Sequence, residues 1–315
     1  MKHNDEPDLK LQNLSLYSAF ALPLGFVGIP LYLYAPDFFA VEFGLSLGLL
    51  GGILLLLRFF DALQDPYIGL LSDRLCHRRG TIVCWSAFVM AASFLLLFVP
   101  PHDFFQATGL GEVLLLLWFA VFTFVASTAF SVLTINLNTF GALWSKNESS
   151  KARIVTFREM VGLVGLVGAL TLPALFGLTS DRQTSLIYFG VLVVVSVFVA
   201  QYLFGKWKQP VGVAPSMRVA NKTFVSRLLG KQGLVFRVYA LSVLASAFPA
   251  VLVLMFVRDY LQLETSFPLF MMSYVFAGLA FMPLWKKLGQ SMGFQRAWMV
   301  SMALAIIAFV GAVFL

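Results

Sequence analysis

The sequence predicts an all-α membrane protein built from two helix bundles. Of the 315 residues, 60% are hydrophobic and only 12% are charged, and the mean hydropathy is +0.88. Soluble domains average about 45–50% apolar and about 25% charged residues, so this chain lacks the charge needed to cover a water-exposed surface. The net charge of +7 is spread between apolar stretches and is not gathered on one face, which excludes a nucleic-acid partner.

Nine apolar segments are long enough to cross a bilayer. About 20 residues of helix span roughly 30 Å of hydrocarbon at a rise of 1.5 Å per residue. In chain order, the segments cover residues 16–34, 44–71, 81–99, 111–133, 156–178, 186–204, 234–257, 268–285 and 297–315. Each is expected to form one membrane-spanning helix.

The connections between the segments predict the orientation of the chain. Nineteen of the 22 lysines and arginines lie before the first segment, in alternate connections or within the first few residues of the segments that follow them. Only Arg182 and Arg258 lie in the opposite set, and Arg58 lies inside a segment. Basic residues accumulate in short loops on the cytoplasmic side of a membrane. We therefore expect an integral protein of the cytoplasmic (inner) membrane with a cytoplasmic N-terminus.

The longest connection separates six segments from three. Residues 206–233 are basic and contain Pro210, Pro215 and several glycines, which is typical of a linker between helix bundles. We expect a six-helix bundle over 1–205, a cytoplasmic linker over 206–233 and a partial second bundle of about three helices over 234–315. Two related six-helix bundles would need about three more segments, so a truncated chain is expected.

The ionisable residues of the second segment are the main candidates for function. Asp61 and Asp65 are one helical turn apart and share a face with Arg58. Charged groups are costly in hydrocarbon, so we expect this face to line the bundle interior or a wet cavity. Two neighbouring carboxylates favour a proton or Na⁺, a hard cation that prefers oxygen ligands. The alternative is an ion pair between Arg58 and Asp61, with Asp65 hydrated near the cytoplasmic edge.

Pro66 adds a third candidate ligand to the two acids. A proline inside a helix has no N–H to donate, which frees the carbonyl group four residues earlier, here that of Ala62. This carbonyl lies between the two acids along the helix. Asp61, Asp65 and Ala62 are therefore the predicted cation ligands, with the two aspartates as the metal ligands if the cation is Na⁺.

The fourth and fifth segments contain candidates for substrate contact. Ser127, Ser131, Thr134 and Asn138 recur at intervals of four, three and four residues and therefore share one helix face. Their polar groups either line a substrate path or form hydrogen bonds between membrane helices. Arg158 either binds a sugar or anionic substrate through paired hydrogen bonds or extends to the cytoplasmic interface.

Two further groups of residues are expected to have structural roles. Gly162, Gly165 and Gly168 recur every three residues in the fifth segment and predict close helix packing. Cys76 and Cys84 have no histidine or acid at ligand spacing, so we expect free thiols.

Several of these residues resemble a known family. One set of residues resembles the second-helix signature of the glycoside-pentoside-hexuronide:cation symporters, the melibiose-permease-like branch of the major facilitator superfamily. These residues are Asp61, Asp65, Pro66, Gly69, Asp73 and Arg74. The turn GLLSDRLCHRRG at 69–80 resembles the superfamily's loop motif, which braces the gate between the bundles. The turn PLWKKLGQSMG at 283–293 is similar, either because the bundles are related or because any cytoplasmic turn attracts basic residues and glycine. The gating or structural candidates are thus Arg58, Gly69, Asp73, Arg74, Arg78 and Arg79.

The resemblance implies a major-facilitator-type fold and symport of a sugar or other small organic solute with Na⁺, Li⁺ or H⁺ by alternating access. It implies that Asp61 and Asp65 bind the coupling cation and that Arg158, in TFREMVGLVG, contacts sugar. Melibiose-type members have sugar-binding acids where this chain has YSAF at 17–20 and Ser127. The implied partners are the bilayer, the substrate and the cation; no other cofactor, nucleic acid or obligate protein partner is expected.

Three other functions are open at this stage. The first is a symporter of lipid-like amphipathic solutes, which the 33 phenylalanines would suit. A drug exporter is disfavoured, because the fifth segment has no glycine-proline antiporter pattern and the aspartate pair is then unexplained. The third is a non-transporting membrane or assembly protein whose charges serve packing. An enzyme is not expected, since the sequence has no Walker loop, HExxH motif or serine-histidine-acid cluster.

Overall fold

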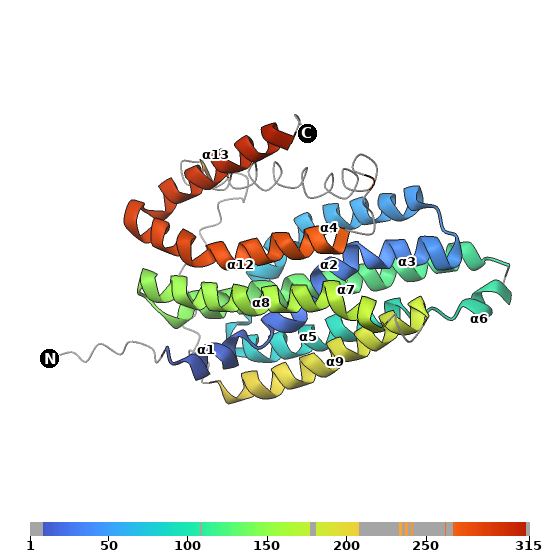
Figure 1. Ribbon diagram of the computed structural model, residues 1–315. Coiled ribbons are helices and arrows are strands. Elements are labelled where there is room, and N and C mark those ends of the chain that lie inside the picture. The colour runs from blue at the N-terminus through green and yellow to red at the C-terminus, as the bar shows by residue number, and fades with distance from the viewer. Residues whose placement is uncertain are drawn as a thin grey trace. The chain divides into compact units, whose positions relative to one another are not determined.

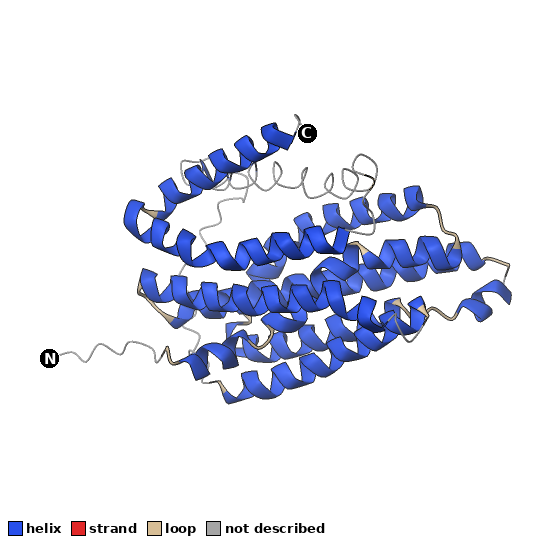
Figure 2. Cartoon of the chain, viewed as in Figure 1, coloured by secondary structure: helices blue, strands red, loops and turns tan. Residues whose placement is uncertain are grey.

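The computed structural model describes residues 9–107, 109–176, 181–207 and 267–312, with isolated positions at 233–234, 237–238, 241 and 262. Every regular element in this part of the chain is a helix, and no strand occurs in it (Figure 2). Seven of its helical stretches are long and apolar enough to cross a membrane. The predicted all-α membrane fold is therefore confirmed.

The first six predicted spans all form helices. The first is divided into α1 (Leu11–Ser18) and α2 (Ala21–Tyr32) and continues into α3 (Tyr34–Phe43). The second is α4 (Leu47–Arg74), which a 3₁₀ turn, η1 (Cys76–Arg78), joins to the third, α5 (Arg79–Leu97). After the short α6 (His102–Ala107), the fourth to sixth spans are α7 (Gly111–Trp144), α8 (Glu148–Phe176) and α9 (Arg182–Lys206).

Two helices are described in the last part of the chain. They are α12 (Phe267–Met292) and α13 (Phe294–Ala312), which cover the segments predicted at 268–285 and 297–315. Most of the span predicted at 234–257 and almost all of the linker predicted at 206–233 lie outside the described residues. The backbone contacts divide the chain into one unit of residues 1–212 with 274–315 and a second of residues 213–273. The expected division at 205 and 233 stays a prediction.

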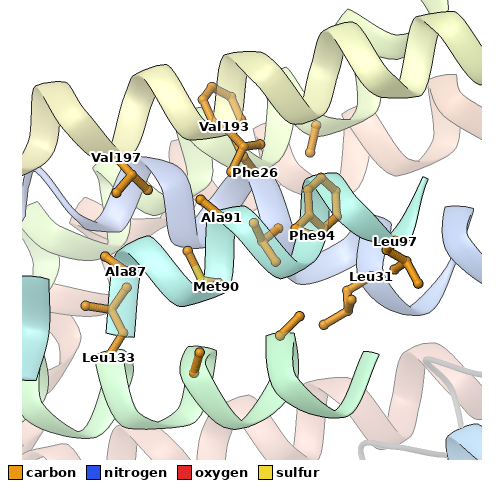
Figure 3. Close-up of a cluster of buried hydrophobic side chains, with 14 of the residues drawn as sticks. Phe26, Leu31, Ala87, Met90, Ala91, Phe94, Leu97, Leu133, Val193 and Val197 are labelled. Carbon is orange, nitrogen blue, oxygen red and sulfur yellow. The ribbon is translucent and has the colours of Figure 1, made fainter. Parts of the chain in front are cut away.

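Helices that are distant in sequence pack together among the first six spans. The most extensive contacts join α5 to α7 and α2 to α8, while α4 packs on α7 and α5 on α9 (Figure 1). Buried apolar side chains from four of these helices, including Phe26, Phe94, Leu133 and Val193, point toward one another in Figure 3. In a bilayer such van der Waals packing, and not the removal of apolar groups from water, holds helices together.

Glycines bring α2 and α8 into backbone contact. A Cβ atom on Gly25 would overlap the Gly162 carbonyl oxygen and lie 3.0 Å from the Gly165 Cα atom. A Cβ atom on Gly165 would overlap the Leu22 carbonyl oxygen, and one on Gly168 would lie 2.5 Å from a ring carbon of Phe26. The prediction of close packing is confirmed for Gly165 and Gly168, whereas a Cβ atom on Gly162 would make an ordinary contact at 3.7 Å.

Candidate functional site

Asp61 lies at the centre of a polar cluster between α4 and α7. It is only 8% exposed. Its Oδ1 atom accepts hydrogen bonds from Gln64 Nε2 at 2.7 Å and from Ser127 Oγ at 3.1 Å. The carboxylate therefore faces the interior of the bundle, where hydrogen-bond donors offset part of the cost of burying its charge.

Gln64 and Thr128 extend this cluster. Gln64 Nε2 lies 3.1 Å from Thr128 Oγ1, and the Thr128 hydroxyl lies 3.2 Å from Gln64 Oε1. A hydroxyl group both donates and accepts hydrogen bonds, so Thr128 suits either end of the amide. Neither residue was among the sequence candidates, although an amide three residues after Asp61 in an apolar segment is a signal that could have found it.

Asp65 follows Asp61 by one turn of α4 and is half-buried beside Ser131. Its Oδ1 atom is buried and has no hydrogen-bond partner among the described residues, and neither has Thr134 Oγ1. Buried polar atoms are nearly always paired in native structures, because an unpaired one costs about 1–3 kcal/mol. The unpaired carboxylate oxygen is thus suited to accept a cation or a proton.

Helix α4 continues through Pro66 without a break. Because proline has no N–H group, the Ala62 carbonyl loses its usual helical donor. Asp61, Asp65 and this carbonyl all offer oxygen, the donor that a hard alkali cation prefers, whereas a soft transition metal prefers nitrogen or sulfur. No group of three or more His, Cys, Asp or Glu side chains is close enough to hold a metal within the described ranges.

Arg58 contacts an aromatic ring. Its Cζ atom lies 3.6 Å from the ring centroid of Tyr32 at the end of α2, a cation–π geometry. Tyr32 in turn interacts with Asp61 and Ser127. Among the ion pairs of the described residues there is none between Arg58 and Asp61, so the alternative interpretation of an ion pair is wrong. The aromatic ring holds the guanidinium group on its own face and leaves the carboxylate to other partners.

The polar stripe of α7 faces both α4 and α8. Ser127 donates to Asp61, Ser131 lies beside Asp65, and Asn138 accepts a hydrogen bond from Arg158. Ser127 was a candidate either for a substrate path or for hydrogen bonds between helices, and its hydroxyl group bonds to Asp61 on α4. The residues of the stripe therefore lie on one face of α7, as their spacing predicts, and contact different partners along the helix.

Arg158 joins α8 to α7. Its guanidinium group donates to Asn138 and forms an ion pair with Glu159. The side chain is 13% exposed. Ser127 and Asn138 are 11 residues apart on α7, roughly 16 Å along the helix. The structure thus does not bring Arg158 and Asp61 into one cluster.

Arg79 is the buried member of the basic turn after α4. It is 1% exposed, whereas Arg74 and Arg78 are exposed and Gly69 is half-buried. Arg79 donates to the Ser72 hydroxyl and carbonyl oxygens, both at 3.3 Å, and lies 3.5 Å from Asp73.

The Arg79 network continues into α7. The Ser72 hydroxyl group donates to Asn136 Oδ1 at 2.7 Å, and Asn136 is fully buried. Neither Ser72 nor Asn136 was among the sequence candidates, because serine and asparagine in a membrane helix are common packing residues. Arg79 therefore fixes the turn to α4, and the Ser72 hydroxyl extends this network to α7.

The two cysteines are free thiols, as predicted. Cys76 is buried in η1 and Cys84 is half-buried in α5. Neither belongs to the polar clusters described above.

Comparison with known proteins gives a family match over nearly the whole chain. The model for the family described as MFS/sugar transport protein matches residues 16–315. The "Uncharacterized symporter YnaJ" of Bacillus subtilis (strain 168) is 32% identical over 171 residues, which cover 52% of this chain and 34% of the relative. The "Isoprimeverose transporter" of Lactiplantibacillus pentosus is 24% identical over 210 residues, covering 64% of this chain and 42% of the relative.

A third relative matches over a shorter stretch. The "Putative glycoside/cation symporter YagG" of Escherichia coli (strain K12) is 37% identical over 75 residues, which cover 23% of this chain and 16% of the relative. The matched stretches thus span less than half the length of these three relatives. No solved structure matches the chain.

Proposed function

The chain belongs to the MFS/sugar transport protein family, and on this premise we propose that it acts in cation-coupled symport of a sugar, a glycoside or another small organic solute. Relatives named as symporters, one of them as a glycoside/cation symporter, support transport. The buried Asp61 carboxylate, with the unpaired Asp65 oxygen one turn away, is the observation that supports cation coupling. A transporter releases its substrate unchanged, so no catalytic residue is assigned.

We propose that Asp61, Asp65, Ser127 and the Ala62 carbonyl would hold the coupling cation, Na⁺ or H⁺. Gln64 and Ser127 now donate hydrogen bonds to Asp61. The Ser127 hydroxyl can turn its hydrogen away and offer its oxygen instead. A cation would supply positive charge that offsets one carboxylate, which lowers the cost of keeping two acids in a low-dielectric bundle.

Arg158 is the proposed substrate contact, with Asn138 as its neighbour on α7. A guanidinium group presents a planar fork of donors that matches vicinal hydroxyl or carboxylate oxygens. Its bonds to Asn138 and Glu159 fix its position. Because Arg158 and Asp61 lie at different levels of the bundle, substrate and cation would bind at separate points.

The membrane setting of this activity follows from the sequence. Seven apolar helices and the family make the chain an integral, multi-pass membrane protein. The distribution of lysine and arginine supports the cytoplasmic membrane and a cytoplasmic N-terminus. Protease digestion of an N-terminal tag in right-side-out and inverted vesicles tests this orientation.

The proposal is tested by cation-dependent stability of the purified chain. NaCl or LiCl is compared with choline chloride at equal ionic strength, and a cation at ten times its dissociation constant should stabilise the folded state by about 1.4 kcal/mol. Asp61→Asn and Asp65→Asn should abolish this gain. Asp103→Asn is the matched control, since Asp103 is fully exposed on α6. If both variants keep the cation dependence of the unchanged chain, the result would favour the alternative in which the two aspartates serve only helix packing.

The substrate class is tested by counterflow in proteoliposomes. Glycosides, uronic acids and lysolipids are compared as external substrates. Sugar counterflow lost in Arg158→Lys, which keeps the charge but not the fork, supports the proposed contact. If only lysolipids show counterflow, the substrate is an amphipathic solute and the proposal of a sugar substrate is wrong.

A further inference from the structure

A groove on the outer surface between α5 and α9 is separate from the polar clusters on α4 and α7. Its volume is about 300 Å³, and its described lining residues are Cys84, Trp85, Phe88 and Gln201. This volume is at the lower end of the range for ligand pockets, roughly 300–1,000 Å³. Trp85 is 64% exposed and Phe88 40%, so the groove opens on the surface that a bilayer covers.

The register of α5 against α9 gives the depth of this groove. Gln201 Nε2 donates to the Cys84 carbonyl oxygen at 2.9 Å, and toward the other ends of the helices Gly190 packs against Leu95. The helices are therefore antiparallel, and the same register places Lys206, the last residue of α9, level with Arg79 at the start of α5. Gln201 lies five residues from this end, roughly 8 Å along the helix.

Polar groups in the groove suit an acceptor at the level of the lipid esters. A glutamine amide has two N–H donors and a carbonyl acceptor, and the Cys84 bond uses one donor. The indole N–H of Trp85 has no hydrogen-bond partner within the described ranges. Donors left unpaired in hydrocarbon are costly, whereas an ester carbonyl at this depth accepts them.

The end of the groove is positively charged. Lys206 Nζ lies 4.1 Å from the ring centroid of Tyr202, which is 65% exposed. Tyr202 lies one turn after Phe198, whose ring contacts Phe88 of the groove. His77 and Arg78 are exposed just before α5. Neither α5 nor α9 contains an acidic residue, and Asp73, at the end of α4, is paired with Arg79. A lysine over an aromatic ring at a membrane interface attracts an anionic headgroup.

We propose that this groove binds a membrane phospholipid with an anionic headgroup. The phosphate contacts Lys206, an ester carbonyl accepts a hydrogen bond from Gln201, and an acyl chain packs on Trp85 and Phe88. This inference concerns a surface that the transport proposal does not use, so either can fail without the other.

Quenching of tryptophan fluorescence by lipids with brominated chains tests the proposal. Phosphatidylglycerol and phosphatidylcholine with the same chains are titrated into the purified chain in detergent micelles. We expect half-maximal quenching at a roughly five-fold lower mole fraction of phosphatidylglycerol, as expected for one lysine near the headgroups. Because the chain has six tryptophans, the signal of Trp85 is taken as the difference between the unchanged chain and Trp85→Phe. Trp85→Phe should remove the part of the quenching that comes from this ring, and equal quenching in Trp85→Phe and the unchanged chain would overturn the proposal.

Two substitutions separate the headgroup contact from the ester contact. Lys206→Gln should abolish the preference for phosphatidylglycerol. Gln201→Leu should weaken the binding of both lipids roughly two- to ten-fold. Gln183→Leu is the matched control, because Gln183 Nε2 donates to the Phe98 carbonyl at the opposite end of the same helix pair. Equal quenching by the two lipids in the unchanged chain, which needs no variant to fold, would refute the anionic headgroup. Equal effects of Gln201→Leu and Gln183→Leu would refute the ester contact.

Discussion

Replacing Gly165 by alanine should force α2 and α8 apart. The added Cβ atom would overlap the Leu22 carbonyl oxygen and lie 3.1 Å from the Gly25 Cα atom and 3.2 Å from the Leu22 carbonyl carbon. All three are backbone atoms, so no side chain can rotate away and one helix must shift. Overpacking of this kind typically costs about 1–3 kcal/mol.

The expected result is a lower unfolding temperature. With an unfolding entropy of about 2.1 cal/mol/K per residue, a loss of about 2 kcal/mol corresponds to a decrease of roughly 3 °C for 315 residues. The assay is thermal unfolding in detergent, followed by circular dichroism. Gly52→Ala in α4 is the control, since a Cβ atom there meets nothing within 4 Å. Equal unfolding temperatures for the two variants would refute the inference that α2 and α8 touch through their backbones.

Three further predictions concern the clusters and a helix end. Ser127→Ala should weaken Na⁺ binding, measured with ²²Na⁺, without unfolding the chain, because it removes one donor to Asp61 and one candidate ligand. Arg79→Met should destabilise the fold by about 2 kcal/mol in thermal unfolding because it removes the donors to the Ser72 hydroxyl and carbonyl oxygens, whereas Arg78→Met, at an exposed position, should change it by less than about 0.5 kcal/mol. Hydrogen bonds from Thr184 lower the pKa of the Asp181 carboxyl, which caps α9, so its stabilising effect is present above the ordinary pKa of 3.8 and is lost as the pH falls through the lowered value. The difference in unfolding temperature between the unchanged chain and Asp181→Ala should therefore shrink on acidification.

The spans and the acidic face could be predicted from sequence because they depend on local rules. Length and hydropathy define a membrane helix, and the four-residue spacing of Asp61 and Asp65 defines a shared face. The partners of these residues depend on how helices pack, which no local pattern specifies. Tyr32 lies 26 positions before Arg58, and Ser72 and Asn136 are 64 positions apart, yet each pair is in contact. Gln64 and Thr128 were missed for the same reason, since each is informative only beside the other.

The hydrogen bonds between α4 and α7 keep a nearly constant difference in residue number. Asp61 pairs with Ser127, Gln64 with Thr128 and Ser72 with Asn136. Parallel helices that are joined by hydrogen bonds at several heights cannot slide past each other without breaking all of these bonds at once. These two helices should therefore translate and tilt as one rigid body. Any motion that exposes Asp61 and Asp65 to one side of the membrane or the other then has to come from the helices around this pair.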